Sequence, residues 1–255
     1  MSKIVIGHLY RDELNLYGDN GNVEVLVSRC LKRNIDVSVV DIGLGSVPSY
    51  KGFSDVNILF MGGGPDSSQK LIYDDFLSEK RSYISDLAAS EKVGIFVCGS
   101  YQLMGNYYKS FDGSVLEGLG LFNIYTENFG SSKPRCIGNV RALLNPQISQ
   151  DPVFKNVSFL GNEIVGFENH GGRTFLDEEV TPFAHVTYGS GNNSEDGTEG
   201  VHQKNFFGTY FHGPVLAKNP HLTDYLIAKA LNVQELLRLD DGLSIASFSA
   251  SKKLR

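Results

Sequence analysis

The chain has 255 residues, of which 41% are hydrophobic and 20% are charged. A chain of this length buries about 70–75% of its unfolded surface, so a large core can form without disulfides or metal ions. The formal net charge is −6 and the Lys and Arg residues are scattered, which argues against nucleic-acid and anionic-membrane partners.

The apolar runs and the cysteines indicate the cellular compartment. The longest apolar runs, near residues 58–61 and 93–98, are far shorter than the ~20 residues that span a bilayer. The N-terminal segment becomes polar too early for the core of a signal peptide. The cysteines, 3 in number, are too few for a disulfide scaffold. We therefore expect a cytoplasmic protein with free thiols and no membrane span.

Short apolar runs alternate with amphipathic segments, which is the pattern of an α/β protein. In chain order this pattern predicts a strand at 3–8, a helix at 22–33, strands at 37–42 and 56–61, a helix at 69–90, a strand at 93–97, a short helix ending at 108, short strands at 164–167 and 206–210, and a helix at 220–231.

The domain organisation is predicted to be simple. Residues 1–231 are expected to form a single domain. The segment 232–255 becomes rich in Ser and ends in Lys252-Lys253-Leu254-Arg255, so we expect a loosely attached C-terminal tail.

The most informative segment is the end of the apolar run at 93–97. There a buried strand delivers Cys98 to a tight turn that opens a helix, which is the geometry of a nucleophile elbow. The positive end of that helix favours a thiolate, and the backbone N–H groups after Cys98 can bind an oxyanion. Gly99 lets the backbone turn and lets a substrate approach. A buried structural cysteine is the common alternative, but the elbow favours a nucleophile.

A cysteine nucleophile needs a base, and His212 is the best candidate of 6 histidines. It follows the strand predicted at 206–210, so it can lie at the same sheet edge as Cys98 although it is distant in sequence. The second candidate is His170, which is followed by two glycines.

The glycine run at 62–64 follows another predicted strand. It lacks the lysine and spacing of a P-loop, and no nucleotide-binding loop or metal-ligand spacing occurs elsewhere in the chain. We therefore expect Gly63 and its neighbours to supply a second oxyanion-hole N–H facing Cys98. This arrangement predicts an acyl-transfer enzyme that forms a thioester.

At these residues the sequence resembles the class I (triad-type) glutamine amidotransferases of the cobyric-acid-synthase-like branch, most closely the glutaminase subunits of lipid II isoglutaminyl synthases. The resemblance runs over roughly residues 3–231 and implies a flavodoxin-like, mostly parallel sheet flanked by helices. The matching motifs lie at 8–10, 14–19, 62–66, 98–102, 117–120, 166–173, 188–193 and 208–214.

The resemblance implies that glutamine is hydrolysed to glutamate and ammonia through a thioester on Cys98, with His212 as the base. Gln102 would hold the intermediate or the glutamine. The backbone around Gly63 and Gly99 would form the oxyanion hole. Arg135 lies where this branch keeps an arginine for the α-carboxylate of glutamine, and a guanidinium suits that anion.

Two positions depart from the family pattern. The wider class places a glutamate two residues after its histidine, but Pro214 stands there. Ser100 replaces a common glycine and should still fit the turn. We therefore expect the third member of the triad to come from elsewhere in this chain or from a partner subunit.

Ammonia is useful only where an acceptor carboxyl is activated, and this chain shows no nucleotide-binding loop. We therefore expect no cofactor in this chain and ATP on a partner. The resemblance implies a Mur-ligase-like ATP-dependent subunit that amidates the D-glutamate of lipid II to D-isoglutamine in peptidoglycan synthesis. The alternatives are a glutaminase for another acceptor, such as a corrin carboxylate, and a non-catalytic scaffold that binds a ligase.

Overall fold

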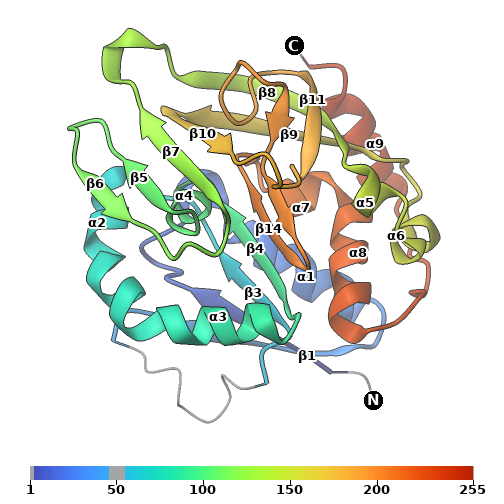
Figure 1. The fold of residues 1–255 in the computed structure, drawn as a ribbon. Coiled ribbons are helices and arrows are strands. Elements are labelled where there is room, and N and C mark those ends of the chain that lie inside the picture. The colour runs from blue at the N-terminus through green and yellow to red at the C-terminus, as the bar shows by residue number, and fades with distance from the viewer. Residues whose placement is uncertain (1–2, 46–54, 255) are drawn as a thin grey trace.

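The computed structural model describes residues 3–45 and 55–254. Its centre is a six-stranded sheet in the order β13-β14-β4-β3-β1-β2 (Figure 1), in which β13 alone is antiparallel to its neighbour. The strands of this sheet are β1 (Lys3–Leu9), β2 (Asp36–Ile42), β3 (Ile58–Met61), β4 (Val93–Val97), β13 (Val201–Gln203) and β14 (Phe206–Thr209). β3 and β4 are buried along their whole length, which explains their continuous apolar runs.

Helices cover both faces of this sheet (Figure 1). The α-helices are α1 (Gly21–Leu31), α2 (Asp66–Asp75), α3 (Arg81–Ala89), α4 (Gly99–Leu103), α5 (Pro146–Ser149), α6 (Pro152–Val157), α7 (Val215–Lys218), α8 (Pro220–Leu231) and α9 (Gly242–Ser251). Helices α1, α7 and α8 contact one another on one side, while α2 and α3 lie on the other. This doubly covered parallel sheet confirms the predicted α/β class.

Two four-stranded sheets lie beyond the carboxyl ends of the central strands (Figure 1). One has the order β10-β7-β5-β6 and the other β12-β11-β8-β9. Their strands are β5 (Tyr107–Lys109), β6 (Val115–Glu117), β7 (Ile124–Asn128), β8 (Cys136–Leu144), β9 (Glu163–His170), β10 (Gly172–Leu176), β11 (Ala184–Tyr188) and β12 (Thr198–Glu199). Segments between residues 107 and 199 therefore surround the sheet edge at which Cys98 was predicted.

Most predicted elements are present, and the bounds of β4 and α8 match the prediction. Two of the predicted helices differ from the structure. The helix expected at 69–90 is divided into α2 and α3 by a π-helical turn, η2 (Phe76–Lys80). The short helix expected to reach residue 108 ends at Leu103, and the chain continues into β5.

The C-terminal segment is attached more firmly than the sequence predicts. Asp241 forms an ion pair of 2.6 Å with the buried Arg29 of α1. Further along, Phe248 of α9 is buried against His221, and Lys252 pairs with Glu163 of β9. The expected loose attachment is therefore wrong for residues 232–254, because buried ionic and aromatic contacts hold them.

Among the helices of residues 3–45 and 55–254, none combines the length and apolarity needed to cross a membrane.

Candidate active site

Cys98 stands between β4 and α4 in a strained turn. Its φ and ψ are 52° and −105°, values that residues other than glycine rarely adopt. The single hydroxyl hydrogen of Ser100 is shared between the carbonyls of Met61, at 2.7 Å, and Val97, at 3.0 Å. These bonds tie the turn to the ends of β3 and β4. The predicted nucleophile elbow is therefore present, and the serine in place of glycine stabilises it.

The structure brings His212 to the same sheet edge, directly beyond β14. Nδ1 of the ring lies 3.1 Å from Oδ1 of Asp19, and neither side chain is exposed. The two residues are 193 positions apart in the sequence. Of the two sources expected for the missing carboxylate, the structure shows the first, because the carboxylate comes from this chain.

Gly63 is the point at which these three side chains meet. A Cβ atom placed on Gly63 would lie 3.1 Å from Cβ of Cys98, 3.0 Å from Cε1 of His212 and 3.1 Å from Oδ2 of Asp19. All three side chains therefore pack around the same Cα. The Nε2 atom of His212 is buried and has no other hydrogen-bond partner in the described part of the chain, so it is available to the Cys98 thiol.

The chain segment that carries Asp19 approaches the glycine run very closely. A Cβ on Gly62 would lie 2.3 Å from the carbonyl oxygen of Leu14, and the N–H of Leu16 donates to the carbonyl of Gly63 at 3.0 Å. Only glycine leaves room for this contact. The glycine run was predicted to supply an oxyanion-hole N–H. In the structure its small residues also let the loop that carries Asp19 pack against the sheet edge.

Pro214, which replaces the usual glutamate, also brings the triad together. Its ring packs on the start of α1, where a Cβ on Gly21 would lie 2.5 Å from Cγ of Pro214. The N–H of Leu216 also donates to Oδ1 of Asn22 at 2.8 Å. These contacts hold the segment after His212 against the first turn of α1, directly after Asp19.

The environment of His212 favours the charged imidazolium. Burial alone would lower its pKa, but the hydrogen bond with Asp19 and the neighbouring Cys98 outweigh burial and raise the pKa to about 10. An imidazolium at this position stabilises negative charge on the Cys98 sulfur, as in other Cys–His pairs.

The oxyanion-hole prediction needs a correction at Gly63. Its N–H donates to Oδ2 of Asp19 at 2.8 Å, so this group positions the carboxylate and cannot also bind an oxyanion. In residues 3–45 and 55–254 the N–H groups of Gly64 and Gly99 have no hydrogen-bond acceptor. Gly64 lies in the cavity lining, and Gly99 is the first residue of α4. These two groups are therefore the available donors.

Gln102 lies one turn into α4 and is buried in a chain of hydrogen bonds. Its Oε1 accepts from Nε2 of Gln69 at 3.1 Å, and its Nε2 donates to the hydroxyl of Tyr210 at 3.1 Å. This network fixes the side chain at the wall of the cavity that contains Cys98.

That cavity, which we call the carboxyl-edge cavity, has a volume of about 340 Å³. It is lined by Cys98, Gln102, His170 and Arg135 among others. The Arg135 guanidinium donates to Oδ1 of Asn169 at 2.9 and 3.1 Å, and to its carbonyl at 3.2 Å. Arg135 is thus held by a neutral partner in the same cavity as the nucleophile, which leaves its charge available to an anion.

His170, the second candidate base, does not have the environment of a base. Its Nδ1 lies 2.8 Å from the carbonyl of Gly172, and its ring stacks on Tyr210 at 3.7 Å between centroids. Burial lowers its pKa to about 3, so the ring is neutral near pH 7. It is therefore part of the cavity wall.

Sequence reasoning missed the role of Asp19, because an Asp-Asn-Gly-Asn segment is typical of a turn or helix cap. The available signal was its position in the motif at 14–19, which lies in the connection that follows a strand ending at the same edge as Cys98. Residues 3–45 and 55–254 contain no group of three or more His, Cys, Asp or Glu residues arranged for a metal ion.

Comparison with known proteins places this geometry in a family. Residues 5–220 match the CobB/CobQ-like glutamine amidotransferase domain. The chain is 41% identical to the lipid II isoglutaminyl synthase (glutamine-hydrolyzing) subunit GatD of Staphylococcus aureus (strain N315), over 90% of this chain and 85% of that protein. It is 38% identical to the GatD subunit of Streptococcus pneumoniae (strain ATCC BAA-255 / R6), over 89% and 80% of the two chains.

Solved structures agree with the fold. PurLQS from Thermotoga maritima matches with a TM-score of 0.61 at 16% identity, over 91% of this chain and 99% of that chain. At this identity the match concerns the fold alone. The sequence matches, together with the elbow and the buried His–Asp pair, show that the chain belongs to the CobB/CobQ-like glutamine amidotransferase family.

Proposed function

We propose that this chain is the glutaminase subunit of a lipid II isoglutaminyl synthase. It hydrolyses L-glutamine at Cys98 and supplies the ammonia to a separate Mur-ligase-like subunit. That subunit binds ATP and amidates the D-glutamate of the lipid II stem peptide to D-isoglutamine, on the cytoplasmic side of the membrane. The chain itself uses no cofactor.

One observation carries the hydrolytic part of this proposal. The strained Cys98 and the Asp19-paired His212 meet around Gly63, beside a cavity that also contains Arg135. The relatives named GatD, which match this chain over most of both lengths, support the choice of lipid II as the acceptor.

In the first half of the reaction the Cys98 thiolate attacks the carboxamide carbon of glutamine. The carbonyl oxygen becomes an oxyanion, which the N–H groups of Gly64 and Gly99 stabilise. The C–N bond then breaks, and the His212 imidazolium gives its proton to the departing nitrogen. The products of this half are ammonia and a γ-glutamyl thioester on Cys98.

In the second half water attacks the thioester carbon and His212 takes up the released proton. The C–S bond breaks, glutamate leaves and the thiolate is regenerated. Throughout the cycle Asp19 holds the imidazole by Nδ1, so that Nε2 faces the reacting atoms. Arg135 binds the α-carboxylate and sets the distance between substrate and sulfur.

The test combines covalent labelling with ammonia release. The glutamine analogue diazo-oxonorleucine should label Cys98, as located by mass spectrometry of the digested protein. Cys98→Ala should abolish both the label and glutamine-dependent ammonia release. The matched control is Cys30→Ala, which removes a buried thiol of α1 that does not line the cavity and should leave the label in place.

The partner is tested by adding the ligase subunit, ATP and lipid II to the wild-type chain. We expect glutamine hydrolysis to be coupled to amidated lipid II, and Cys98→Ala to need added ammonium salt for amidation. Labelling that persists in Cys98→Ala would disprove the enzymatic proposal. Hydrolysis without any amidated lipid II would leave a glutaminase for another acceptor.

A further inference from the structure

The carboxyl-edge cavity contains a second charged side chain, which the sequence analysis did not assign. Asp66, the first residue of α2, lines the cavity together with Arg135 and Cys98. Two of the residues that line the cavity have charged side chains: Asp66 carries a carboxylate and Arg135 a guanidinium. The low pKa of His170 makes its ring neutral. One negative and one positive group therefore face the same space as the nucleophile.

Neither charge is neutralised by the protein in the part of the chain that the structure describes. Oδ1 of Asp66 accepts a hydrogen bond of 2.8 Å from the hydroxyl of Tyr108, and Arg135 is held by Asn169. No ion pair within residues 3–45 and 55–254 includes either Asp66 or Arg135. Both charges are thus oriented by neutral partners and open to a ligand.

Two adjacent glycines of the cavity lining lie near the groups that carry and hold these charges. A Cβ on Gly171 would lie 3.2 Å from Nη1 of Arg135 and 3.0 Å from Nδ2 of Asn128. A Cβ on the adjacent Gly172 would lie 3.6 Å from the ring of Tyr108, whose hydroxyl holds Asp66. The adjacent Gly171 and Gly172 therefore lie between the surroundings of Arg135 and those of Tyr108, which holds Asp66.

We propose that Asp66 binds the α-ammonium group of glutamine while Arg135 binds its α-carboxylate. The inference rests on the proposed function, because it takes glutamine as the substrate. An amino-acid head group is a zwitterion, and a cavity with one fixed charge of each sign complements it. The head group is then anchored at two points, which directs the carboxamide toward Cys98.

A purely structural role for Asp66 is the competing explanation. An acidic residue in the first turn of a helix stabilises the helix through its dipole. That role predicts lower stability in a variant, but it does not predict a change in substrate choice. The experiment therefore measures selectivity between L-glutamine and glutaramate, which is glutamine without the α-amino group.

The variant is Asp66→Asn, which keeps an acceptor for Tyr108 and removes the charge. Ammonia release from L-glutamine and from glutaramate is measured with the full chain and its ligase subunit. If glutaramate reacts too slowly, its affinity is measured instead as competitive inhibition of glutamine hydrolysis. Because a charged hydrogen bond is lost, kcat/KM for L-glutamine should fall roughly 10- to 100-fold, mainly through KM. For glutaramate kcat/KM should change less than about twofold, since no ammonium is present.

Three further variants make the test specific. Asp74→Asn makes the same change at an exposed position of α2 and should leave both substrates unaffected. Arg135→Gln should weaken both substrates equally, because both retain the carboxylate. Tyr108→Phe releases Asp66 from its hydrogen bond. It should lower the ratio of kcat/KM for L-glutamine to kcat/KM for glutaramate by a smaller factor than Asp66→Asn. This variant tests the inference if Asp66→Asn folds poorly.

The outcomes separate this inference from the proposed function. Wild-type hydrolysis of L-glutamine, with an unchanged preference in Asp66→Asn, would overturn the role of Asp66 alone. An equal loss for both substrates would show a structural role and would also overturn it. Absence of glutamine hydrolysis by the wild-type complex would overturn the proposed function and this inference together.

Discussion

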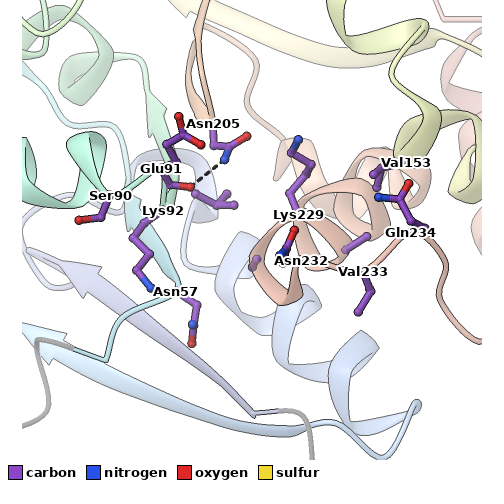
Figure 2. A pocket seen from close by; sticks show the side chains of 13 residues that line it. Asn57, Ser90, Glu91, Lys92, Val153, Asn205, Lys229, Asn232, Val233 and Gln234 are labelled. Carbon is purple, nitrogen blue, oxygen red and sulfur yellow. Dashed lines mark hydrogen bonds between the residues drawn. The ribbon is translucent and has the colours of Figure 1, made fainter.

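Two cavities of similar size lie at opposite edges of the central sheet. The carboxyl-edge cavity, with Cys98, has a volume of about 340 Å³, and the other has about 370 Å³. We call the second the amino-edge pocket, because Asn57, Lys92 and Asn205 line it where the central strands begin, together with Lys229 at the end of α8 (Figure 2). Volume does not distinguish the two.

They differ in what their polar groups already bind. In the amino-edge pocket Nδ2 of Asn205 donates to the carbonyl of Glu91 at 2.7 Å, the bond drawn in Figure 2. In addition, Oδ1 of Asn57 accepts from the N–H of Val5 at 2.8 Å, and Lys229 contacts Asp151 at 3.4 Å. Asn57, Asn205 and Lys229 therefore already bind other parts of the protein.

In the carboxyl-edge cavity several polar groups are oriented but not satisfied. Cys98 has a strained backbone, Arg135 has only neutral partners, and the Gly64 and Gly99 N–H groups have no acceptor within the described residues. Strain and unused hydrogen-bonding capacity are typical of functional sites. Unsatisfied polar groups therefore identify a site in this protein better than the size of a cavity does.

The largest effect should come from Asp19→Asn, which weakens the partner of His212 without a change in size. We expect kcat for glutamine to fall roughly 10²- to 10⁴-fold, because the imidazole loses its orientation and the stabilisation of its charge. Ammonia release in the complex measures this. Activity within about threefold of wild type would show that a carboxylate of the partner subunit performs the role.

The same variant changes the dependence on pH. The His212 pKa is raised to about 10, so the proton that the departing ammonia needs is present at neutral pH and is lost as the pH rises through about 10. The wild-type rate should therefore decline only near that pH. In Asp19→Asn the alkaline decline should begin at a lower pH. If kcat/KM of Asp19→Asn declined at the same alkaline pH as that of the wild type, this account would be contradicted.

Gly63→Ala should have the next largest effect. The new Cβ would be 3.0–3.1 Å from atoms of Cys98, His212 and Asp19, so these side chains must shift by a few tenths of an ångström. We expect kcat to fall about 100-fold, because small displacements of reacting groups are costly. Gly43→Ala is the matched control, since a Cβ there meets no atom within 4 Å. Equal activity of both variants would refute the packing argument.

The sequence predicts the elements of the fold well where local signals agree. The helix α8 begins with a proline and is capped after Leu231 by Asn232, which adopts the left-handed conformation, and its predicted bounds match. The division of the helix expected at 69–90 could not be predicted. A π-helical turn with the buried Lys80 bonded to Asp75 depends on tertiary packing and not on helical periodicity.

The candidate site shows the same limit. Cys98 could be identified from its own strand and turn, because an elbow is a local feature. The motif at 14–19 brings Asp19 near the same sheet edge but does not pair it with His212, since Asp19 reaches the ring through the packing of Pro214 on Gly21 and the close contact of the glycine run. These contacts join segments far apart in sequence and leave no periodic pattern.

Arg135→Gln should act on substrate binding. Because the guanidinium is exposed and bonded to neutral groups, its loss should raise KM for glutamine about 10- to 50-fold and change kcat less than about threefold. Steady-state kinetics of ammonia release measure both constants. A large fall in kcat at unchanged KM would place Arg135 in the chemical step and contradict the assigned role.

The smallest effect on activity should come from the amino-edge pocket. Asn205→Ala removes the hydrogen bond to Glu91, which should lower the free energy of unfolding by about 0.5–1.5 kcal/mol in urea titrations. It should leave kcat/KM for glutamine within twofold of wild type. Asp19→Asn should show the opposite pattern, a large loss of activity. If Asn205→Ala reduced activity without loss of stability, the amino-edge pocket would have to be a functional site, and unsatisfied polar groups would not be a sufficient guide.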